Sequence, residues 1–168
     1  MAALDTLLDF DDGTDVASWY AVNDVVMGGV SRSEFGQAAP GIARFHGNVS
    51  LENSGGFASV RTQPRDWNTA GARAFVLRVR GDGRTYKFTI RTGDGFDGIH
   101  YQQRFSPAAH QWCDVRLPVD QFVPTFRGRR VPFAPALDAA KVRALGLMVS
   151  DKQAGDFELL VDRIAIER

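Results

Sequence analysis

The sequence predicts an all-β domain, a sandwich or barrel, on three observations. Apolar and polar residues alternate with a period of two along several segments, most clearly 74–81 and 85–92. Turn-forming residues, including many of the 17 glycines, recur at intervals of about eight to twelve residues. A helical pattern is found in the short segment 137–145. We therefore expect about ten strands with one or two short helical turns.

Each expected strand is a short run rich in β-branched or aromatic residues and bounded by turn residues. Pro118 ends one of them, because proline cannot donate to a strand ladder. In chain order the expected strands are 7–10, 18–22, 29–35, 42–47, 56–62, 74–81, 85–92, 99–105, 111–118, 145–150 and 157–168.

The two clearest alternations identify core side chains and the turn between them. Gly81, Asp82 and Gly83 separate the two segments and are typical of a β-hairpin turn. Side chains two residues apart share one face of a strand. The expected core face therefore carries Phe75, Leu77 and Val79 from the first segment and Tyr86, Phe88 and Ile90 from the second.

Segment 119–136 has no periodicity and contains several prolines. Structureless loops of this length are uncommon in compact domains and are most often functional. Phe122, Phe126 and Phe133 argue against a disordered linker, because such linkers hold few aromatic residues. We expect an ordered loop that wraps over the sandwich.

Composition predicts one soluble domain, residues 1–168, in the cytoplasm. The 20 basic and 20 acidic residues cancel, so no global field draws the chain to nucleic acid or membrane. Cys113 is the single cysteine, which excludes an internal disulfide. The first residues resemble neither a secretory signal nor a transit peptide. No run of about 18 apolar residues predicts a membrane span.

Sequence motifs for catalysis are absent. There is no G-x-S-x-G elbow, phosphate-binding loop or dinucleotide fingerprint. His46, His100 and His110 are too dispersed for a recognisable metal motif, and mid-strand Cys113 is expected to be a small core side chain. We predict a non-enzymatic protein with no catalytic residues and no cofactor.

A group of acids near the start of the chain is a candidate calcium site. Carboxylate oxygens suit calcium, but the spacing matches no known calcium loop. Acids at a turn are more often a solvated corner, so we predict no metal. The group consists of Asp9, Asp11, Asp12 and Asp15.

Basic side chains at outward strand positions have two interpretations. On one sheet they would form a platform for an acidic protein surface or for RNA phosphates, whereas on two sheets they would be scattered and solvated. They are Arg78, Arg80, Lys87, Arg91, His100, Arg104 and Arg116. A separate group, Arg127, Arg129 and Arg130, lies between Phe126 and Phe133 and is a candidate protein interface.

The aromatic residues also have two interpretations. Trp19, Trp67 and Trp112 are expected in or near the core. A tryptophan exposed beside Tyr101 and Gln103 would instead form a platform for stacking sugars, which leaves carbohydrate binding open.

The stretch Asn23–Ser31, NDVVMGGVS, combines turn residues, a methionine and a glycine pair. Asn23 and Asp24 suit a turn in which side-chain oxygens accept from backbone N–H groups. Gly28 and Gly29 permit a bulge or a close backbone approach, and Met27 suits either a core gap or an adaptable contact. The stretch is therefore a structural corner or the rim of a binding site.

Several segments together resemble the complex I intermediate-associated protein 30 family. They are W..VNDVVMGGVS from Trp19, F.GNVSLENSGGFASVR from Phe45, YQQRF, W..V.LP...F.PTFRG, LGLMVSDKQAGDFEL and VDRIAI. The resemblance implies a galactose-binding-like jelly-roll β-sandwich. It also implies relationship to mitochondrial assembly chaperones of respiratory complex I and to a chloroplast relative tied to RNA. Without a transit peptide, the chain is similar to a stand-alone bacterial member.

We therefore predict a protein-binding or assembly-chaperone domain, with a respiratory-complex subunit as the client. The alternative is a carbohydrate-binding module with a glycan partner, and the third is RNA binding. Asp24 is expected to pair with Arg61 or Arg127 across the site. The predicted binding residues are Asn23, Asp24, Met27, Arg61, Tyr101, Gln103, Arg127, Arg129 and Arg130.

Overall fold

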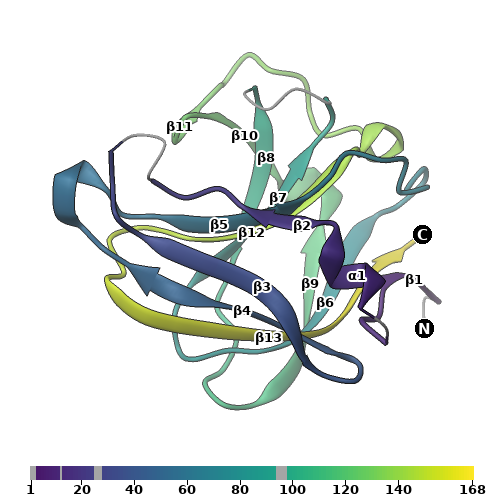
Figure 1. The fold of residues 1–168 in the computed structure, drawn as a ribbon. Helices are drawn as coiled ribbons and strands as arrows, with labels where there is room; N and C mark the ends of the chain where they lie inside the picture. Colours follow the sequence, from purple (N-terminus) through teal and green to yellow (C-terminus); the bar gives the residue numbers. More distant parts are fainter. Residues whose placement is uncertain (1–2, 12, 25–27, 94–97) are drawn as a thin grey trace.

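A computed structural model describes residues 3–11, 13–24, 28–93 and 98–168. Within these ranges the strands form two antiparallel sheets that face each other as a β-sandwich (Figure 1). The six-stranded sheet has the order β3 (Arg32–Ala39), β4 (Ile42–Val49), β13 (Gly155–Glu167), β6 (Ala74–Arg80) and β9 (Trp112–Pro118), with β1 (Leu4–Leu8) beside β13. The predicted all-β sandwich is confirmed.

The second sheet is seven-stranded and carries the features on which the functional argument depends. Its strands come from most of the chain, so residues far apart in sequence lie side by side. Its order is β11 (Arg129–Arg130), β10 (Val123–Phe126), β8 (His100–Phe105), β7 (Tyr86–Arg91), β12 (Ala144–Val149), β5 (Ala58–Thr62) and β2 (Trp19–Ala21).

Helical structure in the described part of the chain is limited to single turns, as expected. They are the α-helix α1 (Thr14–Ala17) and the 3₁₀ turns η2 (Glu52–Ser54), η3 (Val119–Gln121) and η4 (Ala139–Lys141). The helical segment expected at 137–145 is present only as the single 3₁₀ turn η4. Its apolar residues Leu137 and Val142 are buried on either side of this turn, and Val142 is extended, so their burial does not need a longer helix.

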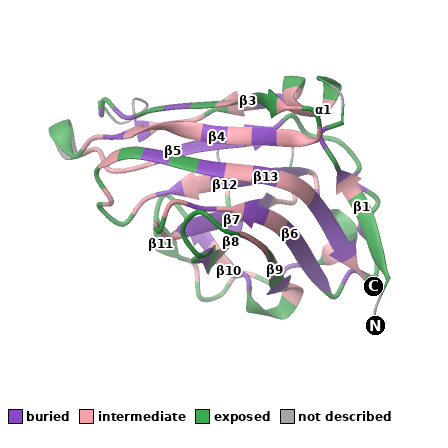
Figure 2. Cartoon of the chain, turned by 90° about the horizontal axis from the view of Figure 1, so that it is seen from below, coloured by how far each residue is buried: buried purple, intermediate pink, exposed green. Residues whose placement is uncertain are grey.

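The core lies between the two sheets and is built by the predicted alternation. All six side chains predicted for the core from 74–81 and 85–92 are fully buried. Figure 2 shows β6 largely buried, whereas buried residues alternate with intermediate and exposed ones along β13. Aromatic rings contact one another across the sandwich: Phe75 lies 5.5 Å from Phe88, and Phe45 lies 6.2 Å from Tyr86, centroid to centroid.

The connection 81–83 was predicted as a hairpin turn, and this prediction is wrong. β6 belongs to the six-stranded sheet and β7 to the seven-stranded sheet, so the connection crosses between sheets. Asp82 fixes the crossing. Its carboxylate accepts hydrogen bonds from Tyr86 Oη (2.9 Å), Arg84 N (3.1 Å) and Glu158 N (2.8 Å). Burial, followed by the Asp82 charge, raises the pKa of Tyr86 above its ordinary value.

Segment 119–136 is ordered, as predicted, but it is not merely a loop. It contains β10 and β11, which pair through Thr125–Arg130 and Phe126–Arg129 and extend the sheet beyond β8. Strands of four and two residues are too short to show a period, which explains why the sequence pattern did not reveal them.

We expect Asp82→Ala to lower the free energy of unfolding by about 2–3 kcal/mol, because three hydrogen-bond donors at the sheet crossing lose their acceptor. Urea unfolding followed by circular dichroism measures this. Asp114→Ala is the matched control: Asp114 is exposed and contacts Arg78 at 3.4 Å, so its loss should cost less than about 1 kcal/mol. Equal losses from the two substitutions would contradict the assigned role of Asp82.

Candidate functional site

The Asn23–Ser31 stretch begins with a side chain that ties neighbouring segments together. Asn23 Oδ1 accepts hydrogen bonds from Ser33 Oγ (2.7 Å) on β3 and from Ser59 N (3.0 Å) on β5. Because β3 and β5 belong to different sheets, this one amide connects the two layers of the sandwich.

Asp24 follows and is fully buried. Its Oδ1 accepts from Ser31 N (2.9 Å), and its Oδ2 accepts from Ser31 Oγ (2.5 Å). Oδ2 also accepts from Gly56 N (2.7 Å) and Phe57 N (3.3 Å) before β5. Ser31 Oγ in turn accepts a hydrogen bond from Ser50 N (2.9 Å). We call Asp24, Ser31, Gly56 and Phe57 the carboxylate node.

The carboxylate node holds its charge without a salt bridge to either predicted arginine. Burial raises the pKa of Asp24, but the hydrogen bonds from Ser31, Gly56 and Phe57 together lower it further, and the net pKa lies below the ordinary value. The predicted pairing of Asp24 with Arg61 or Arg127 is replaced by these donors. The physical reason is that oriented N–H groups and one hydroxyl already satisfy the carboxylate oxygens.

Two glycines make room for the carboxylate. A β-carbon on Gly29 would overlap the Asp24 side chain, and one on Gly55 would lie 2.5 Å from Asp24 Oδ2. The close approach predicted for the Gly28–Gly29 pair is therefore real at Gly29. Asn23 and Asp24 act as the expected turn caps and form a structural corner. Met27 lies outside the described residues.

The predicted binding residues Tyr101 and Gln103 lie on the inner side of β8. Tyr101 pairs with Ile90 and Gln103 with Phe88, both core residues. Tyr101 is buried and its hydroxyl donates to Pro135 O (2.8 Å), while Gln103 Nε2 donates to Pro118 O (3.0 Å). These two side chains support the sandwich from within. Tyr101 is buried and does not contribute to the alternative sugar-stacking platform.

The opposite, outer side of the seven-stranded sheet has a different character. We call it the outer face, meaning the face turned away from the six-stranded sheet. Register places Arg61 opposite Gly146, and Gly146 opposite Thr89. Tyr20 precedes Arg61 in this row, and Gln102 follows Thr89. A polar row therefore crosses β2, β5, β12, β7 and β8, interrupted by a glycine.

Arg61 is held at one end of this row. It is 8% exposed, and its Nε donates to Tyr20 Oη at 2.8 Å. Its guanidinium carbon also lies 5.5 Å from the centre of the Tyr20 ring, within the range of a cation–π contact. Arg61 is thus a positioned cation on the outer face, and its role in binding stays a prediction.

Other basic side chains gather on the same face. Lys87 is 8% exposed and donates to Ser150 Oγ (2.7 Å), with Asp151 Oδ1 at 3.4 Å. Burial lowers the pKa of Lys87. Arg104 holds Asp151 through two hydrogen bonds, of 3.1 and 3.2 Å, and helps to lower the pKa of that carboxyl.

The pKa of His100 is shifted by the cations of the outer face. It is 8% exposed, and its Nε2 lies 3.3 Å from Gln102 Oε1. Burial lowers the pKa of His100 to about 4, assisted by the charges of Arg91, Arg61 and Lys87. The imidazole is therefore neutral at pH 7, and it lies within reach of several cations.

The basic residues predicted at outward positions are divided between the sheets. Arg78, Arg80 and Arg116 lie on β6 and β9 of the six-stranded sheet, where Arg116 holds Glu167 at 2.9 Å. Lys87, Arg91, His100 and Arg104 lie on β7 and β8 of the seven-stranded sheet. Two sheets share the charges, as the second interpretation expected, but the group on the seven-stranded sheet remains together.

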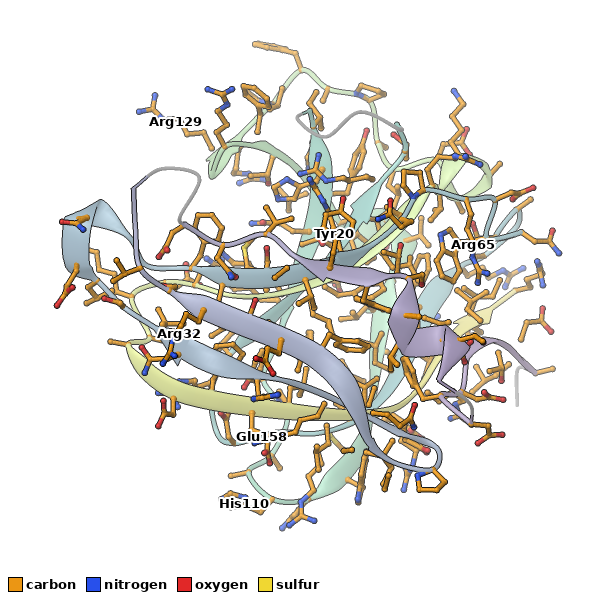
Figure 3. All side chains as sticks on the ribbon, in the orientation of Figure 1. Tyr20, Arg32, Arg65, His110, Arg129 and Glu158 are labelled. Atoms are coloured by element: carbon orange, nitrogen blue, oxygen red, sulfur yellow. The ribbon has the colours of Figure 1, made fainter. Side chains whose placement is uncertain are left out.

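The arginine group 127–130 lies on the β10–β11 hairpin at the edge of this sheet. Figure 1 places the hairpin away from β1 and both chain ends, and Figure 3 shows Arg129 on the side opposite Glu158 and His110. Arg130 pairs with Thr125, which pairs with His100, so the outer face continues to Arg130. Arg127 lies 5.2 Å from the Phe126 ring.

The remaining candidates have structural roles. Trp19 and Trp67 are buried, as predicted, and Trp112 and Cys113 are partly buried. Asp15 Oδ2 accepts from Phe10 N at 3.0 Å, so this acid caps the turn after β1. Asp12 lies outside the described residues.

Two outer-face residues, Tyr20 and Gly146, were missed among the candidates. Both carried a usable signal. Tyr20 lies in the aromatic-rich strand 18–22, and a glycine within the apolar strand 145–150 indicates a close approach. Without the strand order, neither could be placed beside Arg61.

Comparison with known proteins identifies the family. The family described as complex I intermediate-associated protein 30 matches residues 8–161. An uncharacterized protein of Schizosaccharomyces pombe is 30% identical, over 86% of this chain and 75% of its own length. The mitochondrial complex I intermediate-associated protein 30 of Neurospora crassa is 29% identical, over 73% of this chain and 50% of its own length. The protein of that name from Drosophila melanogaster is 25% identical, over 97% of this chain and 62% of its own length. The chain thus spans half to three quarters of these relatives.

Solved structures confirm the jelly-roll fold. A family 11 carbohydrate-binding module from Clostridium thermocellum, in complex with a mixed-linked tetrasaccharide, has a TM-score of 0.72 at 15% identity, covering 99% of this chain and 96% of that one. An exo-beta-agarase has a TM-score of 0.59 at 12% identity, and the match covers 96% of this chain and 25% of the agarase. At these identities the likeness shows the fold alone. Across the described residues, no helix has the length and apolar character to cross a membrane.

We expect Asp24→Asn to lower the free energy of unfolding at pH 7 by about 2–4 kcal/mol, because an amide cannot accept all the donors of the carboxylate node. The lowered folded-state pKa makes this stabilisation complete above the unfolded pKa, about 3.9, and lost as pH falls through the folded value. Chemical unfolding between neutral pH and about pH 2.5 should show the two proteins converging. A constant difference would contradict the charged state of Asp24.

We expect Gly55→Ala to cost about 1–3 kcal/mol, because its β-carbon would lie 2.5 Å from Asp24 Oδ2 and 2.9 Å from Ser50 O. Gly36→Ala is the control, since a β-carbon there meets nothing within 4 Å and should change stability by less than about 0.5 kcal/mol. Thermal and urea unfolding of both variants measures the difference. A neutral Gly55→Ala would show that the node has room to spare.

Proposed function

Because the chain belongs to the complex I intermediate-associated protein 30 family, we propose that it is a non-enzymatic protein-binding domain that assists the assembly of a larger complex. The family match covers most of the described strands, so the proposal concerns the sandwich as a whole. The relatives extend beyond the matched region, and the proposal is restricted to what this domain contributes.

The observation that carries the proposal is the composition of the β10–β11 hairpin and the chain just after it. Phe133 is 99% exposed and Phe126 is 39% exposed, beside exposed Arg127 and Arg129. Exposed aromatic rings lose favourable burial unless a partner covers them. Aromatic and arginine side chains are also the residues that most often dominate protein–protein binding energy. This composition supports a docking surface for a protein client.

The proposed client is a subunit or an assembly intermediate of respiratory complex I. The support is the name of the relatives from Neurospora crassa, Drosophila melanogaster and Mus musculus, each a mitochondrial complex I intermediate-associated protein 30. Those names also say mitochondrial, which differs from the cytoplasmic location predicted from the sequence. A bacterial-type member would meet its client at the cytoplasmic side of a membrane, and we retain this location as part of the proposal.

The two rival functions receive no support from the site. The glycan interpretation required an exposed stacking aromatic beside Tyr101 and Gln103, and Tyr101 itself is buried with its hydroxyl bonded to Pro135 O. The likeness to carbohydrate-binding modules is one of fold. None of the relatives or solved structures described above is named for RNA binding.

The proposal is tested by capture of the client with a tagged chain, using extract of the source organism and mass spectrometry. We expect complex I subunits with the native protein and at least about tenfold less with Phe133→Ser, since loss of an aromatic anchor costs more than about 1.4 kcal/mol.

Leu4→Ser is the matched control. Leu4 is 37% exposed on β1, away from the hairpin in Figure 1, and its replacement should leave capture unchanged. Equal capture by Phe133→Ser and the native chain would remove the hairpin from the proposal. Absence of complex I subunits from every capture would overturn the assembly role.

A further inference from the structure

The six-stranded sheet ends in an open edge at β9. The sheet order places β9 last, and Figure 2 shows it beyond β6 at the rim of this sheet. Among the strands that the structure describes, none pairs with the other edge of β9. An open strand edge presents backbone N–H and C=O groups that can pair with another chain, so proteins normally keep such edges short or covered. β9 is seven residues long, which makes its edge a candidate interaction surface.

The register with β6 shows which residues of β9 present backbone groups at the open edge. Val119 N donates to Arg73 O (2.8 Å), one position beyond the facing residues Pro118 and Ala74. Hydrogen-bonded and non-hydrogen-bonded pairs alternate along an antiparallel ladder, so every second residue of β9 turns its N–H and C=O away from β6. These residues are Trp112, Asp114, Arg116 and Pro118.

The pairing capacity of this edge is greatest at its middle. Pro118 has no N–H, and its C=O already accepts a hydrogen bond from Gln103 Nε2 (3.0 Å). Asp114 and Arg116 each offer both an N–H and a C=O toward the edge. A further strand would therefore pair chiefly with these two residues.

The sequence of β9 is complementary to itself when two copies run antiparallel. With a two-fold axis at Val115, Asp114 of one copy lies opposite Arg116 of the other, and the two residues exchange backbone hydrogen bonds. Trp112 lies opposite Pro118 on the same side of the sheet, which gives an apolar pair. Opposite charges and apolar side chains are the favourable cross-strand combinations.

The other side of β9, which faces the core, matches in the same way. Val115 lies opposite its own copy, and Cys113 lies opposite Leu117. Cys113 and Val115 are partly buried and already pack against the hydrophobic core. Pairing of two copies would thus extend an apolar layer across the edge and remove more apolar surface from water.

Charge selects this register over its neighbours. An axis at Asp114 would place two aspartates opposite each other, and an axis at Arg116 would place two arginines there. Like charges directly opposite each other destabilise a strand pair. The axis at Val115 avoids both arrangements.

Both charged side chains have partners within the chain that a second copy need not displace. Arg116 holds Glu167 through Nε (3.0 Å) and Nη2 (2.9 Å), so its Nη1 can donate elsewhere. Asp114 Oδ1 lies 3.4 Å from Arg78 Nη1 and 3.7 Å from Arg163 Nη2, so its Oδ2 can accept elsewhere. The side chains of Arg116 and Asp114 are 51% and 53% exposed. A second copy would extend these ion pairs across the edge.

We propose that two copies of this chain associate through β9, antiparallel about a two-fold axis at Val115, so that their six-stranded sheets become one continuous sheet. A two-fold interface uses the same patch on both copies, which the pairing of Asp114 with Arg116 satisfies. The interface is small, so we expect a weak dimer with a dissociation constant of about 10–100 μM. This association goes beyond the proposed function and does not depend on the identity of a client.

Sedimentation velocity of the full chain, at concentrations from about 1 to about 300 μM, measures the association. We expect a dimer whose dissociation constant rises at least about tenfold in Arg116→Asp and in Asp114→Arg, because each change places like charges opposite each other. Glu158→Arg is the matched control. Glu158 is an exposed acid of β13 in the same sheet, paired with Arg44 (2.7 Å), and its replacement should leave association unchanged.

Mixing the two variants separates contact across the axis from a defect within one chain. A dimer of one Asp114→Arg chain and one Arg116→Asp chain again pairs opposite charges at both places, so an equal mixture should associate although neither variant does alone. A native chain that stays monomeric over the whole range would overturn the proposal. Unchanged association of Arg116→Asp, or no association on mixing, would also overturn it.

A cysteine at the axis tests the register without the charge variants. The two Val115 residues form a non-hydrogen-bonded pair, whose Cα atoms lie about 4.5 Å apart, within reach of a disulfide. Val115→Cys in a Cys113→Ser background should therefore form a cross-linked dimer under mild oxidation, seen on a non-reducing gel. Arg44→Cys in the same background is the control and should remain uncrosslinked. No cross-link at Val115, or equal cross-linking at Arg44, would overturn the proposed pairing.

Discussion

The sandwich depends on one buried negative charge. Asp24 has no exposed surface, yet it remains ionised because N–H and O–H donors converge on it from two other segments of the chain, at Ser31 and at Gly56–Phe57. A buried carboxylate is costly unless such donors surround it, so the segments must assemble together or not at all. Gly29 and Gly55 are consequences of this requirement, since each vacates the volume that the carboxylate occupies. The Asn23–Ser31 stretch is therefore conspicuous in sequence because it surrounds the charge of Asp24.

The two faces of the seven-stranded sheet show how one alternation serves two purposes. On β7, Tyr86, Phe88 and Ile90 enter the core, and the residues between them build the outer face. Arg61 and His100 are mostly covered although they point away from the core. Burial keeps His100 neutral at pH 7, whereas Arg61 keeps its charge at a position where solvent screens it little. The core thus fixes the strand positions that set the spacing of the cations.

Much of the fold could be predicted because alternation is a local property of the chain. The strands that contain Phe75 and Tyr86 were recognised in this way. The order of strands was not accessible, and that order decided the outcome at Asp82, where a hairpin-like sequence crosses between sheets. The strand order also determines which side chains share the outer face. Arg61 on β5 and Arg91 on β7 lie near each other because both strands pair with β12. Tyr101 was misplaced for a simpler reason, since a strand's two faces cannot be assigned as inside or outside from a short polar run.

The position of β13 has a consequence for how the protein is made. This strand is the longest described, pairs with β4 and β6 along the middle of its sheet, and also receives β1, with Leu4 opposite Glu167. Each of these partners leaves the ribosome before it. Until β13 emerges, the nascent chain carries strands with unfilled edges, and its ordering waits for contacts between distant parts of the sequence. Folding of this half of the sandwich is therefore expected to wait until β13 has emerged, and during that interval the exposed edges are open to chaperones.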